Sequence, residues 1–264
     1  MKLNSVVRVF AVGLLGMAGA VTAVQSAPIT KQVTLQSIQV CDDDGVTNCA
    51  SANTYESFAD KIWAQAGIDF VFLPTLTWSS TLYNNYDFDN DDGSQLAQGN
   101  LAFAPALGVL NVFFVNALPV DGGLSTLYGY GCGAPVFIGA CFGNAGVVIN
   151  SSDVDSFNGG VGRLDTVAHE IGHVLGLGHN TFGAGGGENL MTSGNDRTVP
   201  GSLAGITDDG ITGLSLLTAA QIAEARSSSY AKDLTVPEPV SLALVGVALL
   251  GLGATRRRQR SVAT

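Results

Sequence analysis

Positively charged residues and histidine are scarce in this chain of 264 residues. It contains 12 Lys and Arg against 22 Asp and Glu, so its formal net charge is −10, and it has only 3 histidines. Nucleic-acid binding requires clustered Lys and Arg, so we expect no nucleic-acid partner. Charged residues make up 13% of the chain and hydrophobic residues 46%, which excludes disorder driven by charge and allows one sizeable core.

The few basic residues are unevenly placed along the chain. Lys2 and Arg8 lie near the N-terminus, and four arginines lie near the C-terminus, namely Arg256, Arg257, Arg258 and Arg260. The segment between them retains only Lys31, Lys61, Arg163, Arg197, Arg226 and Lys232. This middle segment is therefore strongly acidic, and it suits cationic partners better than anionic ones.

The first 26 residues have the pattern of a secretory signal peptide. Lys2 and Arg8 supply its positive start, an apolar run rich in Ala and Gly covers 9–24, and small residues follow. Cleavage after Ala23 or Ser26 would suit a signal peptidase. An uncleaved membrane anchor is the alternative, but the glycines within the run and the small residues at its end favour cleavage. We expect residues 1–26 to be a signal peptide.

The C-terminal segment, 236–264, has three parts in a fixed order. Val236-Pro237-Glu238-Pro239 comes first, an apolar stretch covers 240–254, and the arginine cluster follows. This arrangement resembles the PEP-CTERM sorting signal of bacterial exported proteins. The resemblance implies an exosortase-type processing enzyme as a partner, transient membrane association, and a periplasmic, outer-surface or extracellular-matrix location. The apolar stretch is short for a full span, which needs about 20 residues, although a plain C-terminal anchor is the alternative.

The 4 cysteines form two close pairs in the sequence, Cys41 with Cys49 and Cys132 with Cys141. Such pairs suit an oxidising compartment and are consistent with export. Three disulfide connectivities can be drawn, of which local pairing is the simplest. A cysteine metal site is disfavoured because neither pair has the C-x-x-C spacing of zinc ribbons.

Residues 27–235 are predicted to form one α/β (α+β) domain. Its expected strands are 31–40, 68–73 (closed by Pro74), 110–115 and 146–150, and its expected helices are 56–66, 164–175 and one that Thr218 opens with a capping box. Helix 164–175 carries an apolar stripe on one side, so polar residues on its other side are free to carry chemistry.

All three histidines of the chain fall within eleven residues of the second helix and the turn after it. His169 and His173 are one helical turn apart, so both imidazoles project from the same face and can hold one metal ion. Gly176 lets the chain leave the helix in a left-handed conformation, which could bring His179 back as a third ligand. Three neutral histidines leave a fourth zinc position open for water, as in catalytic sites. An exposed polar pair is the alternative interpretation of such spacing.

The run from His169 to His179 reads H-E-x-x-H-x-x-G-x-x-H, which resembles the signature of the metzincin zinc proteases. Those enzymes also have a methionine turn beneath the zinc, and Met191 is the residue here that matches it. The resemblance implies a twisted mixed sheet with an antiparallel edge strand, an active-site helix and a C-terminal helix. The residue after the last histidine is Asn180, which leaves the choice between a matrixin-like and a pappalysin-like branch open.

The site implies hydrolysis of peptide bonds by a zinc-activated water, with Glu170 as general base and then general acid. An extended substrate is expected to lie along an edge strand at Gly146, Val147, Val148 and Ile149. One alternative is a catalytically idle, surface-displayed binding or matrix protein, although such a protein would not need Glu170. Another is a zinc hydrolase that acts on a non-peptide amide.

A second, weaker metal pattern is the acidic segment with Asp87, Asp89 and Asp91. Hard cations such as Ca²⁺ prefer clustered carboxylates. However, Asp92 stands where an EF-hand loop requires glycine, and Gln98 stands where it requires glutamate. A solvated acidic turn is therefore favoured over a calcium site.

Overall fold

The computed structural model describes residues 27–85, 94–133, 141, 143–207 and 210–234. The expected signal peptide (1–26), the sorting segment (236–264) and the acidic residues Asp87, Asp89 and Asp91 lie outside the described residues. None of the helices within the described ranges combines the length and hydrophobicity that a membrane crossing requires.

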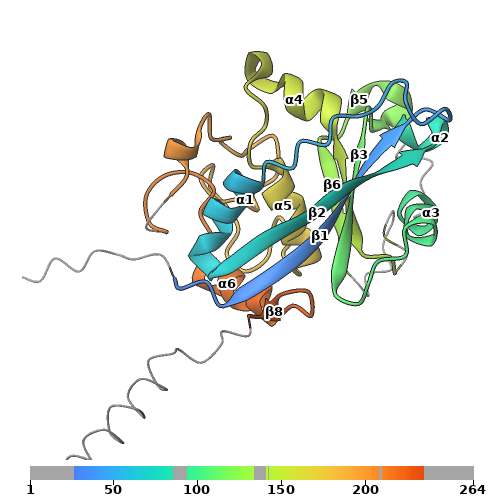
Figure 1. The fold of residues 1–264 in the computed structure, drawn as a ribbon. Coiled ribbons are helices and arrows are strands. Elements are labelled where there is room, and N and C mark those ends of the chain that lie inside the picture. The colour runs from blue at the N-terminus through green and yellow to red at the C-terminus, as the bar shows by residue number, and fades with distance from the viewer. Residues whose placement is uncertain (1–26, 86–93, 134–140, 142, 208–209, 235–264) are drawn as a thin grey trace, which may run out of the picture.

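A twisted mixed sheet forms the centre of the described structure (Figure 1). Its strands follow the order β2 (Ile68–Ser79), β1 (Lys31–Cys41), β3 (Val109–Val115), β7 (Gly146–Asn150) and β6 (Gly129–Cys132). The first four are mutually parallel, and β6 is antiparallel to β7. The short strand β8 (Lys232–Asp233) adds an antiparallel pair to β1, while β4 (Pro119–Val120) and β5 (Ser125–Thr126) form a separate hairpin.

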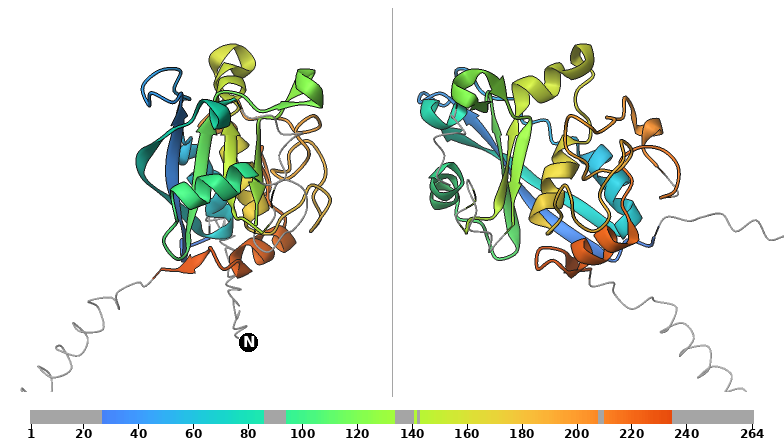
Figure 2. Two further views of the ribbon diagram at one scale, coloured as in Figure 1. Left: turned by 90° about the vertical axis from the view of Figure 1, so that its right-hand side faces the viewer. Right: turned by 180° about the vertical axis from the view of Figure 1, so that it is seen from behind.

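Helices cover both faces of this sheet. On one face lie α1 (Glu56–Trp63), with its 3-10 extension η1 (Ala64–Ala66), and α5 (Thr166–Val174), and on the other lies α3 (Ser94–Ala102), as the left view of Figure 2 shows. The remaining elements are α2 (Thr81–Asn84), η3 (Asp121–Gly123), α4 (Ser151–Gly160), η5 (Leu203–Gly205) and α6 (Ala219–Ser227).

The central strand β3 explains why both faces need a cover. Successive side chains of a strand point to opposite faces. Val112 and Phe114 belong to the larger core with α1 and α5, whereas Phe113 and Val115 belong to the smaller core with Leu96 of α3. A continuous apolar run is therefore buried on both sides, as expected for an internal parallel strand.

Most of the predicted elements are present, with two corrections. Thr218 opens α6 with the expected capping box, in which its side chain accepts from the Gln221 N–H and the Gln221 side chain accepts from the Thr218 N–H. Pro74, however, does not end its strand, because β2 continues to Ser79. The strand shifts register opposite Ser37, and Pro74 is tolerated because β2 lies at the edge of the sheet.

The second correction concerns β7, which was expected to be the substrate-binding edge strand. It pairs with β3 on one side and with β6 on the other, and all five of its residues are buried. Gly146, Val147, Val148 and Ile149 thus belong to the core and offer no free edge. The antiparallel edge strand is β6, which lies next to α5.

Both local disulfides are confirmed, Cys41–Cys49 at the end of β1 and Cys132–Cys141 at the end of β6. No free cysteine remains among the described residues. Two disulfides indicate an oxidising, extracellular type of compartment.

Candidate metal centre

Helix α5 and the turn after it present the three histidines. Asp165 is the N-cap residue of α5, and its carbonyl accepts from the His169 N–H at 2.9 Å. The helix ends at Val174 with Leu175 as its C-cap, and Gly176 follows with φ +99°, a left-handed conformation that glycine adopts without strain. This turn brings His179 back towards the helix, as the glycine in the motif predicted.

The Nε2 atoms of the three histidines converge on one point. The Nε2 of His179 lies 3.1 Å from that of His169 and 3.2 Å from that of His173. One ligand nitrogen from each histidine lies within 4.8 Å of the others, and no other group of this kind exists among the described residues. The three side chains that the spacing singled out are therefore brought together by the fold.

The opposite ring nitrogens show whether this donor set fits a metal. The Nδ1 of His173 lies 2.8 Å from the Leu177 carbonyl oxygen, and the Nδ1 of His169 lies 2.6 Å from the Leu190 carbonyl oxygen. A carbonyl can only accept, so both contacts are satisfied when the proton is on Nδ1, which leaves the Nε2 lone pair free for a metal. At His169 the Nη1 of Arg197 also lies 2.6 Å from Nδ1. The carbonyl partners of His173 and His169 thus fit the tautomer that a zinc site requires.

Burial keeps the histidines in the neutral form that binds metals. It lowers the pKa of His169 well below its ordinary value, and the positive charge of Arg197 adds to this effect. Burial also lowers the pKa of His173 and of His179. A neutral imidazole offers a lone pair and repels no cation, so the site is ready for a divalent ion near neutral pH.

Glu170 is a residue of α5 whose side chain approaches β6, and it is only 6% exposed. One of its carboxylate oxygens is 4.0 Å from the Nε2 of His173, at the point where the histidines converge. Burial raises the pKa of Glu170 to about 8, and the charges of Arg197 and Arg163 partly oppose this. A cation bound nearby would lower this pKa, so the carboxylate would then be available as a base.

Glycines on β6 allow α5 to approach the edge strand closely. A Cβ atom at Gly131 would overlap the carbonyl oxygen of Glu170, and one at Gly129 would lie 3.1 Å from the Glu170 Cγ. A Cβ atom at Gly133, just after the strand, would lie 2.8 Å from the Val174 carbonyl oxygen. The edge strand thus passes directly along the backbone of the helix that carries His169, Glu170 and His173.

Met191, which the resemblance identified as the residue of the methionine turn, is fully buried. A Cβ atom at Gly172 of α5 would lie 2.5 Å from the Met191 Sδ, so the glycine makes room for the methionine. The turn is closed by Asn189, whose side-chain oxygen accepts from the Met191 N–H at 3.0 Å. The side chains of Asn189 and Gln221 exchange two hydrogen bonds, which tie this turn to α6.

Two buried arginines next to the centre were missed in the sequence. Arg197 forms an ion pair with Asp165, in which its Nε lies 2.8 Å from the Asp165 Oδ2. Arg163 donates to the Gly194 carbonyl and lies over the ring of Tyr128 at 4.3 Å. The sequence did offer one indication of their role. Both arginines belong to the few basic residues between the chain ends, and both flank the histidine motif.

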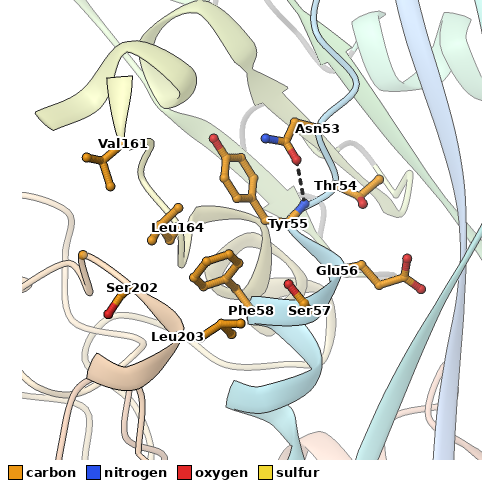
Figure 3. A pocket seen from close by; sticks show the side chains of 11 residues that line it. Asn53, Thr54, Tyr55, Glu56, Ser57, Phe58, Val161, Leu164, Ser202 and Leu203 are labelled. Carbon is orange, nitrogen blue, oxygen red and sulfur yellow. Dashed lines mark hydrogen bonds between the residues drawn. The ribbon is translucent and has the colours of Figure 1, made fainter. Parts of the chain in front are cut away.

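A separate pocket of about 610 Å³ lies at the N-terminal end of α1. The rings of Tyr55 and Phe58 face Leu164 and Leu203 across it (Figure 3). No residue of the metal centre lines this pocket, so it belongs to a different part of the surface.

Comparison with known proteins identifies similarity to metallopeptidases. The family model of the reprolysin-like metallopeptidases, M12B, matches residues 49–180, a range that includes the histidine motif. No curated protein matches the sequence. The matching branch is reprolysin-like, whereas the sequence had left a matrixin-like or pappalysin-like branch open.

Three solved structures are similar at low identity. Metalloproteinase-II from Bacteroides fragilis has a TM-score of 0.40 at 16% identity, covering 77% of this chain and 57% of that one. The zinc-dependent peptidase from Methanocorpusculum labreanum has a TM-score of 0.38 at 13% identity, and the match covers 73% of this chain and 99% of that one. Archaemetzincin from Methanopyrus kandleri has a TM-score of 0.40 at 12% identity, and the match covers 74% of this chain and 94% of that one. This chain thus spans little more than half of the Bacteroides protein.

Proposed function

Because the chain belongs to the reprolysin-like family M12B of metallopeptidases, we propose that it is an exported zinc endopeptidase in which Glu170 is the general base. The family and the three histidines indicate a zinc-dependent metallopeptidase that acts on protein or peptide substrates. The convergence of three histidine Nε2 atoms beside a buried glutamate carries the proposal.

His169, His173 and His179 would hold the zinc ion. When bound, zinc lowers the pKa of a water molecule and polarises the carbonyl of the scissile peptide. The Glu170 carboxylate takes a proton from the attacking water and then delivers it to the nitrogen of the leaving amine. Burial raises the proton affinity of the Glu170 carboxylate, which favours the first transfer, and the strongly basic nitrogen of the leaving amine drives the second.

We propose that the substrate lies along β6 and not along β7. An extended peptide can add to a sheet only at its edge, and among the described strands β6 is the last in the sheet order, next to α5. The glycines of β6 keep the strand close to Glu170, so a peptide beside it would pass near the catalytic carboxylate. The segment after Met191, roughly Thr192 to Ile206, would form the opposite wall.

Replacement of Glu170 by glutamine tests this function. The protein would be produced in an oxidising compartment and assayed on an unfolded protein substrate beside Glu170→Gln and the matched control Glu188→Gln. Glu188 is exposed and belongs to the same part of the chain. We expect bound zinc in all three, and in Glu170→Gln a loss of activity of about 10²–10⁴-fold.

The outcomes separate the proposal from its alternatives. Equal cleavage by the parent and Glu170→Gln would disprove the role of Glu170. Zinc bound by a parent that cleaves no unfolded protein would favour the catalytically idle binding protein. Hydrolysis of small amides without protein cleavage would favour the non-peptide hydrolase. Zinc that binds equally well after all three histidines are replaced would exclude them as ligands.

The chain ends are proposed to direct export and sorting. Residues 1–26 would be removed as a signal peptide, 27–235 would form the peptidase domain, and 236–264 would be recognised by an exosortase-type enzyme. The two disulfides support an oxidising destination. The intact mass of the protein recovered from its native host tests this division, because an unprocessed chain would contradict it.

A further inference from the structure

The ion pair of Arg197 and Asp165 is almost completely buried beside the metal centre. Its side chains are 2% and 0% exposed, and the guanidinium donates twice to the carboxylate, from Nε at 2.8 Å and from Nη2 at 3.3 Å. Burying an ion pair carries a desolvation penalty that often cancels its Coulomb attraction. We therefore expect this pair to contribute little to the free energy of unfolding and to act mainly by fixing the positions of the groups that it joins.

The pair connects the two backbone segments that hold the ring of His169. Asp165 caps α5, and its carbonyl accepts the His169 N–H. The Nη1 of Arg197 donates at 2.9 Å to the carbonyl of Thr192, in the turn whose Leu190 carbonyl faces the ring. Breaking the pair would release the turn from the start of the helix.

The guanidinium also touches the ring itself. Its Nη1 lies 2.6 Å from the His169 Nδ1, the same nitrogen that faces the Leu190 carbonyl at 2.6 Å. A single nitrogen cannot donate to the carbonyl and accept from the guanidinium at once. Metal binding through Nε2 requires the proton on Nδ1, so the carbonyl is the partner in the metal-competent form, and the guanidinium next to the ring then bonds to Asp165 and to the Thr192 carbonyl.

We infer that Arg197 and Asp165 form a positioning pair, which holds the His169 ring against the Leu190 carbonyl so that its Nε2 points at the other two histidines. The inference rests on the proposed zinc site. Arg197 touches no substrate or reacting atom in this role and acts only through His169. Groups that orient a metal-binding histidine typically change metal affinity by 10–100-fold when they are removed.

Arg163 provides a matched control for a purely structural role. It is also buried, at 3% exposure, and it also ties the segment after Met191 to the start of α5, through its bond to the Gly194 carbonyl at 2.9 Å. Its guanidinium lies over Tyr128 and Phe157 and has no hydrogen bond to a histidine. Loss of Arg163 should therefore lower stability without moving the His169 ring.

The first experiment measures zinc affinity by competition with a chelator, together with the thermal unfolding of the metal-free protein. It compares the parent, Arg197→Met and Arg163→Met at a temperature where all are folded. We expect Arg197→Met to bind zinc at least 10-fold more weakly, and Arg163→Met to remain within about 3-fold of the parent. Equal affinity in the parent and Arg197→Met would overturn the inference.

A double variant separates positioning from folding. Asp165→Leu combined with Arg197→Met removes both charges, and such replacements often restore stability. We expect the melting temperature to recover towards that of the parent while zinc affinity stays lowered. Recovery of both would show a purely structural pair. If Arg197→Met alone does not fold, the double variant gives the answer, and a parent that binds no zinc would instead refute the proposed function.

Discussion

The two edges of the sheet differ in length, direction and neighbours. β2 is a long parallel edge strand whose residues from Pro74 onwards are largely exposed. β6 is short and antiparallel, and two of its four residues are glycines, of which Gly131 lies against the backbone of α5 and Gly129 against the Glu170 side chain. At β2 the edge is a surface, whereas at β6 it is one wall of the proposed catalytic centre.

This difference shows where the molecule tolerates change. A side chain added on the solvent side of β2 meets water, and its effect on folding should be small. A side chain added on the helix side of β6 meets the Glu170 backbone and must displace the residue proposed as the general base. The glycines of β6 are thus required by close approach, not by backbone conformation, since neither Gly129 nor Gly131 has a positive φ.

Of the substitutions that compare the two edges, Gly131→Ala should have the largest effect on stability and activity. The new Cβ would overlap the Glu170 carbonyl oxygen, so α5 or β6 must move. Because the clash is with backbone, we expect a loss of about 3 kcal/mol in the free energy of unfolding and a strong loss of peptidase activity. Denaturant unfolding measures the first, and cleavage of an unfolded protein measures the second.

The control for Gly131→Ala is Thr77→Ala on β2. Thr77 is exposed at the opposite edge, so its truncation should change the free energy of unfolding by less than about 1 kcal/mol and leave activity intact. Similar losses in the two variants would mean that the two edges do not differ in the way described.

Removing each disulfide in turn compares the two sides of the sheet, because Cys41 ends β1, the neighbour of β2, and Cys132 ends β6. The sequence separations are 8 for Cys41–Cys49 and 9 for Cys132–Cys141, so loop entropy predicts a similar loss of about 2.5 kcal/mol for each. Cys132 ends β6, so its loss should also lower activity, whereas the loss of Cys41–Cys49 should not.

Double serine variants of each pair, assayed for unfolding and for cleavage, test this expectation. The activity assay must be run where both variants are folded, so that stability alone cannot separate them. Equal activity in the two double variants would show that the β6 end needs no covalent support for catalysis.

The smallest predicted change in stability depends on pH and arises where Asp60 of α1 contacts β2. Burial raises the pKa of Asp60 to about 6, against the hydrogen bond from the Phe70 N–H of β2, which lowers it. The folded protein therefore binds this proton more tightly than the unfolded chain, and stability should fall as pH rises from about 4 to about 6. Because Asp60 is only half-buried, we expect a contribution of about 1 kcal/mol.

Asp60→Asn keeps an oxygen that can accept the Phe70 N–H and removes the titration. The variant should gain about 1 kcal/mol over the parent above pH 6 and nothing below pH 4. Unfolding curves of both proteins across this range provide the measurement. A parent that becomes more stable between pH 4 and 6 relative to the variant would contradict the direction of the shift.

The sequence predicted much of the fold because its signals were local. The apolar run of β3, the stripe of α5 and the capping box at Thr218 each depend on residues a few positions apart. The two disulfides were predicted for the same reason, since each joins neighbours in the chain. The edge strand was assigned wrongly because strand order depends on distant pairing, and the short, glycine-rich β6 carries no alternating apolar pattern.

The candidate ligands could be identified from the sequence, because the spacing of His169, His173 and His179 is a property of one helix and one glycine turn. The sequence also identified Glu170, which follows the first ligand on the same helix. What surrounds these residues depends on the packing of the folded core. The Leu190 carbonyl, the Arg197 guanidinium and the glycines of β6 come from other segments of the chain, and packing brings them within hydrogen-bond distance or contact.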